Sequence, residues 1–434
     1  MKTTRLPIGI KDFKELITDN YIFVDKSDFI REIIEAPKVN IITRPQAFGK
    51  TLNLSMLRYY FERPYPPCVQ HLLDEPQEYF RLMASAGNLN AHAMVTEENA
   101  KLFDNLTIAN WVDYQKYMHR YPVISISLDD IGKGPFDMCM KRLAEIMSRE
   151  FERHDYLLSN NNDTFEMDRK DFTQILNRTA SPFVLQSSLY LLIRMLHKFH
   201  NEKVVVLVDD YDKPLQQAFT GGHYDELKNF LQVFFETAFR DNSIIFRGVV
   251  CGNLLIPDET VLGGFDSFQA DTLLNDTMDK SFGFTESEMK ELLDKCMLEW
   301  LQEPMSHWFG GFISGRGHLF HPKSVISCLQ NNDHDLKVYT LKDNSIIKEL
   351  LQMCPFSTIE IIKSLLEGDH LISGLKEFVD LKRGCQSMEN LFSVLFHLGY
   401  LSVETDFDRS NDVELHHRLK ITNLESIQVI AQIL

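Results

Sequence analysis

The sequence has little of what holds a secreted or zinc-bound protein together. Its seven cysteines are odd in number and scattered over 434 residues, with no CxxC pair and no Cys/His spacing typical of zinc. We therefore expect reduced, buried thiols in an intracellular protein. No apolar run reaches the roughly 18 residues that a membrane-spanning helix needs. The first residues, MKTTRLPIGIKDFKEL, lack the apolar core of a secretory signal. These absences predict a cytoplasmic protein with no membrane segment.

Positive charge is also scarce. Lys and Arg number 45 against 62 Asp and Glu, which gives a formal net charge of −17. This balance argues against a surface that holds long stretches of nucleic-acid phosphate, but it allows a local basic pocket for one triphosphate. Hydrophobic residues at 44% and charged residues at 25% are typical of a soluble globular protein. The length leaves room for about two or three domains.

Short β-branched runs alternate with helical patterns through the first 275 residues. The alternation predicts a mostly parallel sheet covered by helices on both faces, an α/β fold. A strand at 21–24 and a helix from 27 to 35, with Ser27 as its N-cap, are predicted ahead of this pattern. The main strands are expected at residues 38–43, 121–128, 204–208 and 244–250, and the main helices at residues 135–151, 181–200 and 224–239.

The first predicted strand of that sheet leads into RPQAFGKT and then into a helical pattern. A strand, a loop and a helix in this order are the context of a phosphate-binding loop. Backbone N–H groups at the helix start can hold phosphate oxygens, Lys50 can reach the β and γ phosphates, and the Thr51 hydroxyl can hold magnesium. The usual pattern is GxxxxGK[ST], and Arg44 stands at its first glycine. An ordinary capped helix with a solvated lysine is the alternative.

The most apolar strand, VVVLV, ends in two acids. It would deliver Asp209 to the carboxyl edge of the sheet, where a carboxylate can coordinate magnesium, usually through water. Asp210 would then be placed to orient or polarise an attacking water. The plainer interpretation is a strand that ends in a polar turn at 212–214.

Eight segments follow one another in a recognisable order: LPIGIKDFKEL (6–16), YIFVDKSDFI (21–30), ITRPQAFGKTLNLSMLRYYF (42–61), LFDNLTI (102–108), YPVISISLDDI (121–131), VVVLVDDYDKPL (204–215), FGFTESEM (282–289) and WFGGFISGRGHLFHPKSV (308–325). Together they resemble the AAA-ATPase-like family of bacterial proteins, many of which carry a PD-(D/E)xK nuclease domain at the C-terminus. The resemblance implies ATP with Mg²⁺ as ligand. It implies nucleotide-binding residues Arg44, Phe48, Gly49, Lys50, Thr51 and Leu52, metal ligands Thr51 and Asp209, and Asp210 as the catalytic residue.

Several positions depart from the family pattern. Gln46 and Ala47 replace two arginines of RPRRFGK, and Asp210 replaces the glutamate of DEYD. Lost arginines weaken stabilisation of the γ-phosphate in the transition state, and the shorter Asp210 draws its carboxylate back. Nucleotide binding with slow or absent turnover is one interpretation. Drift within an active family, with Arg44, Arg58 and Arg247 compensating, is the other. The remaining departures are Cys251 for a threonine, Leu255 for an arginine, Asp258 near a lysine position, and the missing acid in 308–312.

Three regions are expected. Residues 1–275 would form the P-loop ATPase domain, with an insertion at about 63–120. Residues 276–384 would form a helical lid, and 385–434 a winged-helix-like end, after which the nuclease domain of the family is not found. Closure of the C-terminal part over ATP, sensed by a protein partner, would make a weak ATPase or a nucleotide-dependent switch. The alternative is an interaction scaffold that has lost its nucleotide.

Overall fold

The central element of the protein is a five-stranded, all-parallel sheet in the order β2-β3-β4-β1-β5. Its strands are β1 (Val39–Thr43), β2 (Val123–Ser127), β3 (Val204–Asp209), β4 (Ile245–Gly252) and β5 (Gln269–Asp271). The α/β class and four of these strands confirm the sequence prediction; β5 was not predicted. A computed structural model describes residues 5–63, 98–159, 166–240, 242–257, 268–315, 317–331, 334–339, 344–384, 387–404 and 416–434.

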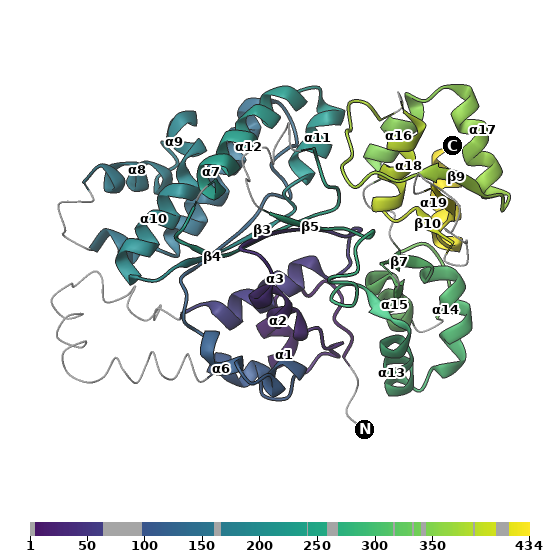
Figure 1. Cartoon of the computed structure of the whole chain (residues 1–434), viewed down its shortest axis with the longest axis horizontal. Coiled ribbons are helices and arrows are strands. Elements are labelled where there is room, and N and C mark those ends of the chain that lie inside the picture. Colours follow the sequence, from purple (N-terminus) through teal and green to yellow (C-terminus); the bar gives the residue numbers. More distant parts are fainter. Residues whose placement is uncertain are drawn as a thin grey trace.

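Helices cover both faces of the sheet, as the sequence predicts (Figure 1). Side chains of neighbouring residues point to opposite faces of a strand, so Ile41 joins one hydrophobic core and Ile42 the other. On the Ile42 side lie α1 (Phe13–Thr18), α2 (Asp28–Glu35), α3 (Lys50–Phe61) and α6 (Tyr114–Tyr117). On the Ile41 side lie α7 (Phe136–Glu152), η4 (Asp155–Ser159), α8 (Glu166–Leu176), α9 (Pro182–Gln186), α10 (Ser188–His200), α11 (Lys213–Gly221) and α12 (Tyr224–Phe239).

Two N-terminal predictions need correction. Residues 21–24 form no strand in the described N-terminal segment; Tyr21 makes only a single bridge to Arg5. Ser27 does precede α2, but its hydroxyl does not cap that helix. It accepts a hydrogen bond from the amide of Ile108 instead. This stretch is therefore held by side-chain contacts to the segment around residue 108 and not by the hydrogen bonds of a strand.

The long helix predicted over 181–200 is interrupted at Ser187, where α9 ends and α10 begins. The Ser187 hydroxyl bonds to the carbonyl of Val184, and the Ser188 hydroxyl bonds to the carbonyl of Leu185. Serine hydroxyls that bond to nearby carbonyls compete with the helical pattern, and this explains the break.

The predicted insertion at about 63–120 lies partly outside the described residues, which resume at residue 98. Its described end contains the short 3₁₀ helices η2 (Lys101–Phe103) and η3 (Thr107–Asn110). Phe103 is fully buried and packs against Phe13 and Tyr60. This end of the insertion is therefore part of the core beside α3.

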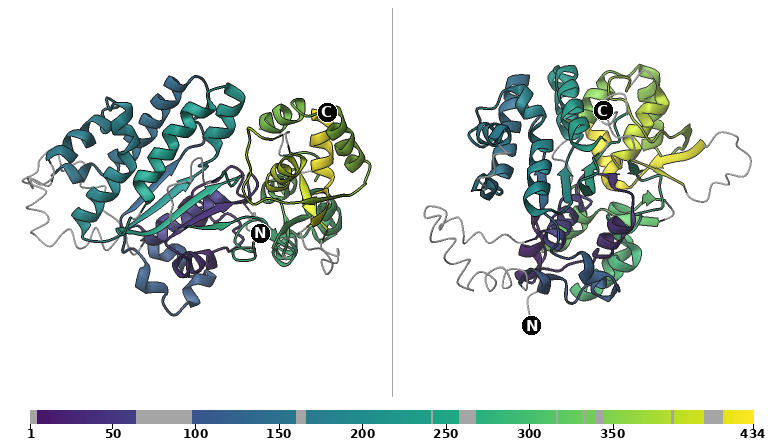
Figure 2. Two further views of the ribbon diagram at one scale, coloured as in Figure 1. Left: turned by 45° about the horizontal axis from the view of Figure 1, so that its top comes forward. Right: turned by 60° about the vertical axis from the view of Figure 1, so that its left-hand side comes forward.

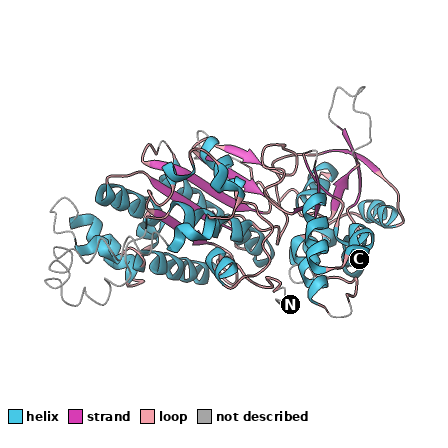
Figure 3. Cartoon of the chain, turned by 90° about the horizontal axis from the view of Figure 1, so that it is seen from below, coloured by secondary structure: helices cyan, strands magenta, loops and turns pink. Residues whose placement is uncertain are grey.

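The C-terminal part lies beside the sheet and contains two small antiparallel sheets (Figures 2 and 3). The first unit has β6 (Phe284–Thr285), α13 (Glu286–Cys296), η7 (Glu299–Leu301), α14 (Gln302–Phe309), β7 (Phe312–Ser314), β8 (Gly317–Phe320) and α15 (Pro322–Gln330). The second has α16 (Ser345–Gln352), α17 (Phe356–Leu366), β9 (Leu371–Gly374), α18 (Met388–His397), β10 (Leu401–Val403), β11 (His416–Ile421) and α19 (Leu424–Ile433).

Within residues 385–434, predicted as a winged-helix-like end, the strands β10 and β11 lie between the helices α18 and α19. A third strand, β9, pairs with the other side of β11 and was not predicted. None of the helices in the described ranges combines the length and the apolar character needed to cross a bilayer.

Candidate nucleotide-binding site

The loop between β1 and α3 forms an open turn at the carboxyl edge of the sheet. Gly49 adopts a left-handed conformation (φ 93°) and begins α3 without a side-chain cap. A Cβ at Gly49 would meet no heavy atom within 4 Å, so space remains in front of the helix start. The amides of Lys50, Thr51 and Leu52 open α3 and have no acceptor inside that helix. Uncapped amides at the positive end of a helix dipole suit an anion.

Lys50 is buried, and its ammonium lies over this loop rather than in solvent. Its Nζ donates to the carbonyls of Arg44 and Pro45, at 2.7 and 2.8 Å, and to Asn253 Oδ1 at 2.9 Å. Burial lowers the pKa of Lys50, against the nearby carboxylates, which raise it. The alternative of a solvated lysine on an ordinary helix start does not describe this side chain.

Thr51 and Asp209, the two predicted metal ligands, are in direct contact. The Thr51 hydroxyl at the start of α3 donates to Asp209 Oδ2 at the end of β3, with 2.5 Å between the oxygens. Burial, together with the neighbouring Asp210, raises the pKa of Asp209 to about 6, while the bond from Thr51 and the charge of Lys50 act in the opposite direction. The two halves of the predicted site therefore meet at one point.

Asp210 follows in a left-handed conformation (φ 53°), which is uncommon for a residue with a side chain. Its amide donates to Asp209 Oδ1 at 3.1 Å. Asp210 is only partly buried. Its charge, with those of Asp209 and Asp212, offsets part of the lowering that burial causes in the pKa of Lys50. The predicted catalytic carboxyl thus lies beside the predicted metal ligand, at the same edge of the sheet.

Asn253 belongs to the site and was missed by the sequence analysis. It follows β4 directly, and its Oδ1 accepts from Lys50. Its own amide and that of Leu254 donate to the buried carboxylate of Asp212, whose pKa burial raises to about 6. Asp212 is therefore a buried anchor in the turn that precedes α11. A polar residue directly after a buried strand was the signal that could have identified Asn253.

The close approach of β4 to this carboxylate requires a glycine at 252. A Cβ on Gly252 would come within 2.5 Å of Asp212 Oδ1 and 2.6 Å of the Tyr211 ring. Real Cβ atoms do not approach this closely, so a larger residue would displace the Asp212 anchor and Asn253 with it.

Arg44 is fully buried and points to β5. Its guanidinium donates to the carboxylate of Asp271 and to the carbonyls of Thr43, Asp271 and Met278. It also lies over the ring of Phe282, at 5.2 Å from the centroid. The side chain thus fixes the loop to β5. The predicted nucleotide contact of Arg44 remains a prediction.

Phe48 and Leu52 likewise have packing roles. The Phe48 ring is buried and meets Phe312 and His321 edge-to-face, with centroids 5.0 and 5.3 Å apart. Its carbonyl accepts from the amide of Gly283 at 3.1 Å. The Leu52 side chain packs half-buried against the core around α3. Residues far along the chain thus hold the phosphate-loop candidate in shape, and the predicted nucleotide contacts of Phe48 and Leu52 stay predictions.

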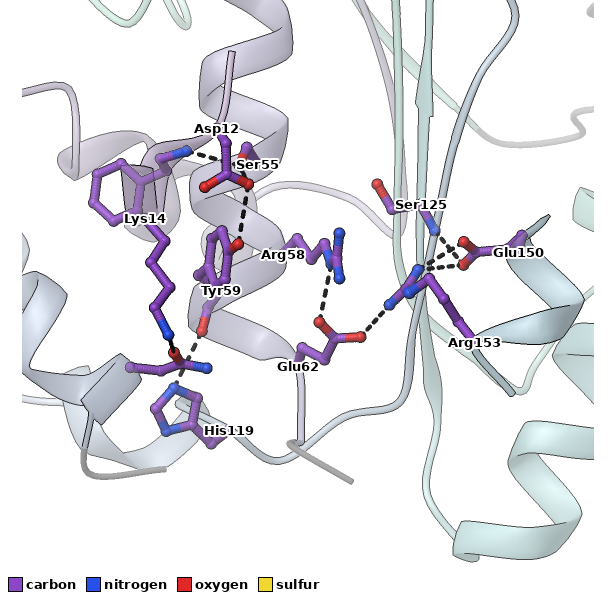
Figure 4. A network of polar contacts seen from close by, with 12 residues as sticks. Asp12, Lys14, Ser55, Arg58, Tyr59, Glu62, His119, Ser125, Glu150 and Arg153 are labelled. Carbon is purple, nitrogen blue, oxygen red and sulfur yellow. Dashed lines mark hydrogen bonds and ion pairs between the residues drawn. The ribbon is translucent and has the colours of Figure 1, made fainter. Parts of the chain in front are cut away.

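The other arginines proposed to compensate bond elsewhere. Arg58 forms an ion pair with Glu62 at 2.9 Å. Glu62 also pairs with Arg153, which forms a second ion pair with the buried Glu150 (Figure 4). Arg247 donates to the backbone carbonyls of residues 33, 34 and 246. In this arrangement neither Arg58 nor Arg247 supplies positive charge to the start of α3.

Magnesium was predicted at this site, and the donors present fit it. Mg²⁺ is commonly held by one or two carboxylates, a hydroxyl, water and substrate phosphates rather than by a cage of protein side chains. Thr51 and Asp209 supply such a hydroxyl and carboxylate. Within the described ranges no group of three or more His, Cys, Asp or Glu side chains is placed to form a separate metal centre.

Comparison with known proteins now bears on this geometry. A family model described as a predicted AAA-ATPase matches residues 7–73 and 89–261, which include the loop, Asp209 and Asn253. The chain belongs to this AAA-ATPase-like family. The resemblance predicted from the sequence is thereby confirmed, and membership supports nucleotide binding in general terms. The parallel sheet with its open loop is compatible with the P-loop-like fold expected for such a protein.

One curated protein is similar over nearly the whole chain. It is described as an uncharacterized protein in the vnfD 5' region of Azotobacter chroococcum mcd 1. The two are 22% identical over 427 residues, which cover 98% of this chain and 69% of the relative. No solved structure matches the chain.

Proposed function

We propose that this AAA-ATPase-like chain binds ATP with Mg²⁺ at the turn between β1 and α3. The observation that carries the proposal is the 2.5 Å contact between Thr51 and Asp209, which joins two motif halves 158 residues apart. A hydroxyl and a carboxylate brought together beside a buried lysine and an uncapped helix start match the chemistry of a metal–triphosphate ligand.

In this proposal the chain's own residues mainly bind the phosphates and Mg²⁺ and orient a water. The amides of Lys50, Thr51 and Leu52 would hold phosphate oxygens, and the Lys50 ammonium would move from its three protein acceptors toward the β and γ phosphates. Thr51 and Asp209 would hold Mg²⁺, which when bound neutralises charge on the phosphates. Asp210 would orient a water. Because Arg44, Arg58 and Arg247 bond elsewhere, we propose slow turnover, as in a weak ATPase or a nucleotide-dependent switch.

We further propose that the C-terminal part transmits the nucleotide state to a protein partner. Residues 276–384 would act as a lid and 385–434 as a winged-helix-like end, in a cytoplasmic protein. Contacts of Phe312 and His321 with Phe48 support this, because they place the C-terminal part against the loop. A DNA-binding role of the winged end predicts salt-dependent binding of DNA by the full chain, and the net charge of −17 argues against it.

A scaffold without nucleotide is the second candidate. It is favoured by one observation: Lys50 and Thr51 already have protein partners. A site whose polar groups satisfy one another is stable without a ligand, so the fold could persist after binding is lost.

A thermal-shift series with ATP, ADP and GTP, each with and without Mg²⁺, separates the two candidates. A ligand that binds only the folded state stabilises it by about 2.7 kcal/mol at a hundred times its Kd, so ATP with Mg²⁺ should raise the melting temperature. An unchanged melting temperature at millimolar nucleotide, together with no binding in equilibrium dialysis, would support the scaffold instead.

A further inference from the structure

One buried histidine reaches the phosphate-loop candidate from the C-terminal part. His321 stands at the start of α15, and its Nε2 lies 3.0 Å from the carbonyl oxygen of Gln46. Its imidazole also packs against the Phe48 ring. His321 lies beyond the residues that the family model matches, 7–73 and 89–261. The loop is therefore shaped in part by a residue beyond the range of that family model.

The contacts of His321 fix its protonated nitrogen. The Gln46 carbonyl can only accept a hydrogen bond, so Nε2 must carry the hydrogen. Nδ1 accepts from the amide of Ser324 at 3.2 Å and thereby caps α15. Burial lowers the pKa of His321 to about 4, which keeps the ring neutral near pH 7. One nitrogen thus serves the helix cap and the other serves the loop.

The contact continues from His321 to the last helix. The Ser324 hydroxyl lies 3.0 Å from Nδ1 and bonds to Glu425 Oε2 at 2.8 Å. The other carboxylate oxygen of the buried Glu425 accepts from the amide of Tyr339 at 2.7 Å. Since Glu425 lies in the first turn of α19, a continuous set of hydrogen bonds joins the loop to the second C-terminal unit.

The loop conformation needs such support. Ala47 adopts a left-handed conformation (φ 61°) that is unfavourable for a residue with a Cβ, and Gly49 follows with φ 93°. Persistent left-handed residues require surroundings that hold them. The carbonyl of Gln46 comes directly before this pair, and Gln46 itself is exposed. The bond from the buried His321 therefore holds the residue that comes directly before Ala47.

We propose that His321 is a positioning residue for the phosphate loop. Through the Gln46 carbonyl it holds the Ala47–Gly49 turn in the form that presents the amides of Lys50 to Leu52. Through Ser324 and Glu425 it ties this turn to α19. The inference rests on the proposed nucleotide function and names the device by which the C-terminal part senses the loop.

Two matched variants separate the two nitrogens of His321. In His321→Asn the side-chain carbonyl can still accept from Ser324 and cap α15, but the side chain is too short to reach Gln46. In His321→Gln the amide nitrogen can replace Nε2 and donate to Gln46. A role in general packing would affect both variants alike, whereas a positioning role separates them.

The first readout uses the protein without nucleotide. The amides of Asn53 and Gly283 donate to the carbonyls of Gly49 and Phe48, so their hydrogen exchange reports the loop directly. We expect about tenfold faster exchange at both amides in H321N and near wild-type exchange in H321Q. Equal exchange in wild type and H321N, or equal acceleration in both variants, would overturn the proposal.

The second readout is ATP affinity measured by calorimetry. H321N should bind ATP with Mg²⁺ about tenfold more weakly than wild type, and H321Q should bind within about threefold of it. If wild type binds no ATP, the proposed function fails, while the exchange experiment still decides the positioning role. Glu425→Gln tests the link to α19: faster exchange at Asn53 supports it, and unchanged exchange there overturns it.

Discussion

Replacing Thr51 by valine tests the contact on which the proposed site depends. Valine keeps the shape of threonine but removes the hydroxyl that donates to Asp209 at 2.5 Å. A hydrogen bond to a charged group contributes about 1.5–3 kcal/mol to stability. Because Asp209 keeps the amide of Asp210 as a donor at 3.1 Å, we expect the lower part of this range, a loss of about 1.5–2 kcal/mol in the free energy of unfolding. The same change removes a proposed ligand of Mg²⁺.

The assay combines urea unfolding with calorimetric titration of ATP, with and without Mg²⁺. Thr51→Ser is the matched control, since serine keeps the hydroxyl and loses only a methyl group. In Thr51→Val, affinity for ATP with Mg²⁺ should fall at least about tenfold, a loss of about 1.4 kcal/mol, while the weaker Mg²⁺-free affinity should change little. Wild-type affinity for ATP with Mg²⁺ in the valine variant would refute the assignment of Thr51, and so would an equal loss in the serine control.

Three further changes test other parts of the account. Asp210→Asn should reduce any Mg²⁺-dependent phosphate release about a hundredfold with little change in ATP affinity; wild-type release would remove Asp210 from catalysis. Arg44→Met leaves Asp271 buried without its partner and should cost about 3–5 kcal/mol in urea unfolding, whereas a loss under about 1 kcal/mol would contradict the buried pair. Burial lowers the pKa of His397 to about 4 from 6.5, so the unfolded chain takes up the proton first as pH falls. Relative to His397→Gln, wild type should lose up to about 3 kcal/mol of unfolding free energy between pH 6.5 and 4, and a constant difference would contradict this.

The sequence predicted best the elements that are buried on both faces or that follow from a pattern of neighbouring residues. A run of five apolar residues before Asp209 predicts a strand covered on both faces, and every residue of β3 is buried. The strand, loop and helix around Gly49 were also predicted correctly, because β-branched runs and helical apolar spacing are local patterns.

The features that the sequence did not predict depend on contacts between residues far apart in the chain. The sequence did not predict that the side chain of Arg44 pairs with Asp271, which lies on a strand of only three residues. Asn253 acquires its role only because Asp212 binds its backbone. The third strand beside β11 comes from residues 371–374, and the helix α18 and the strand β10 lie between the two in the chain. Each of these pairings depends on the folded chain rather than on a local pattern.

The most direct test of the central claim is calorimetric titration of ATP with Mg²⁺ into wild type and Lys50→Met. The ammonium that this change removes is buried, with three acceptors around it. Truncating one partner of a buried, charged hydrogen bond costs about 2–5 kcal/mol of binding free energy, so affinity should fall by at least about thirtyfold in a variant that remains folded by circular dichroism. Equal affinity in the two proteins would contradict a triphosphate site at Lys50.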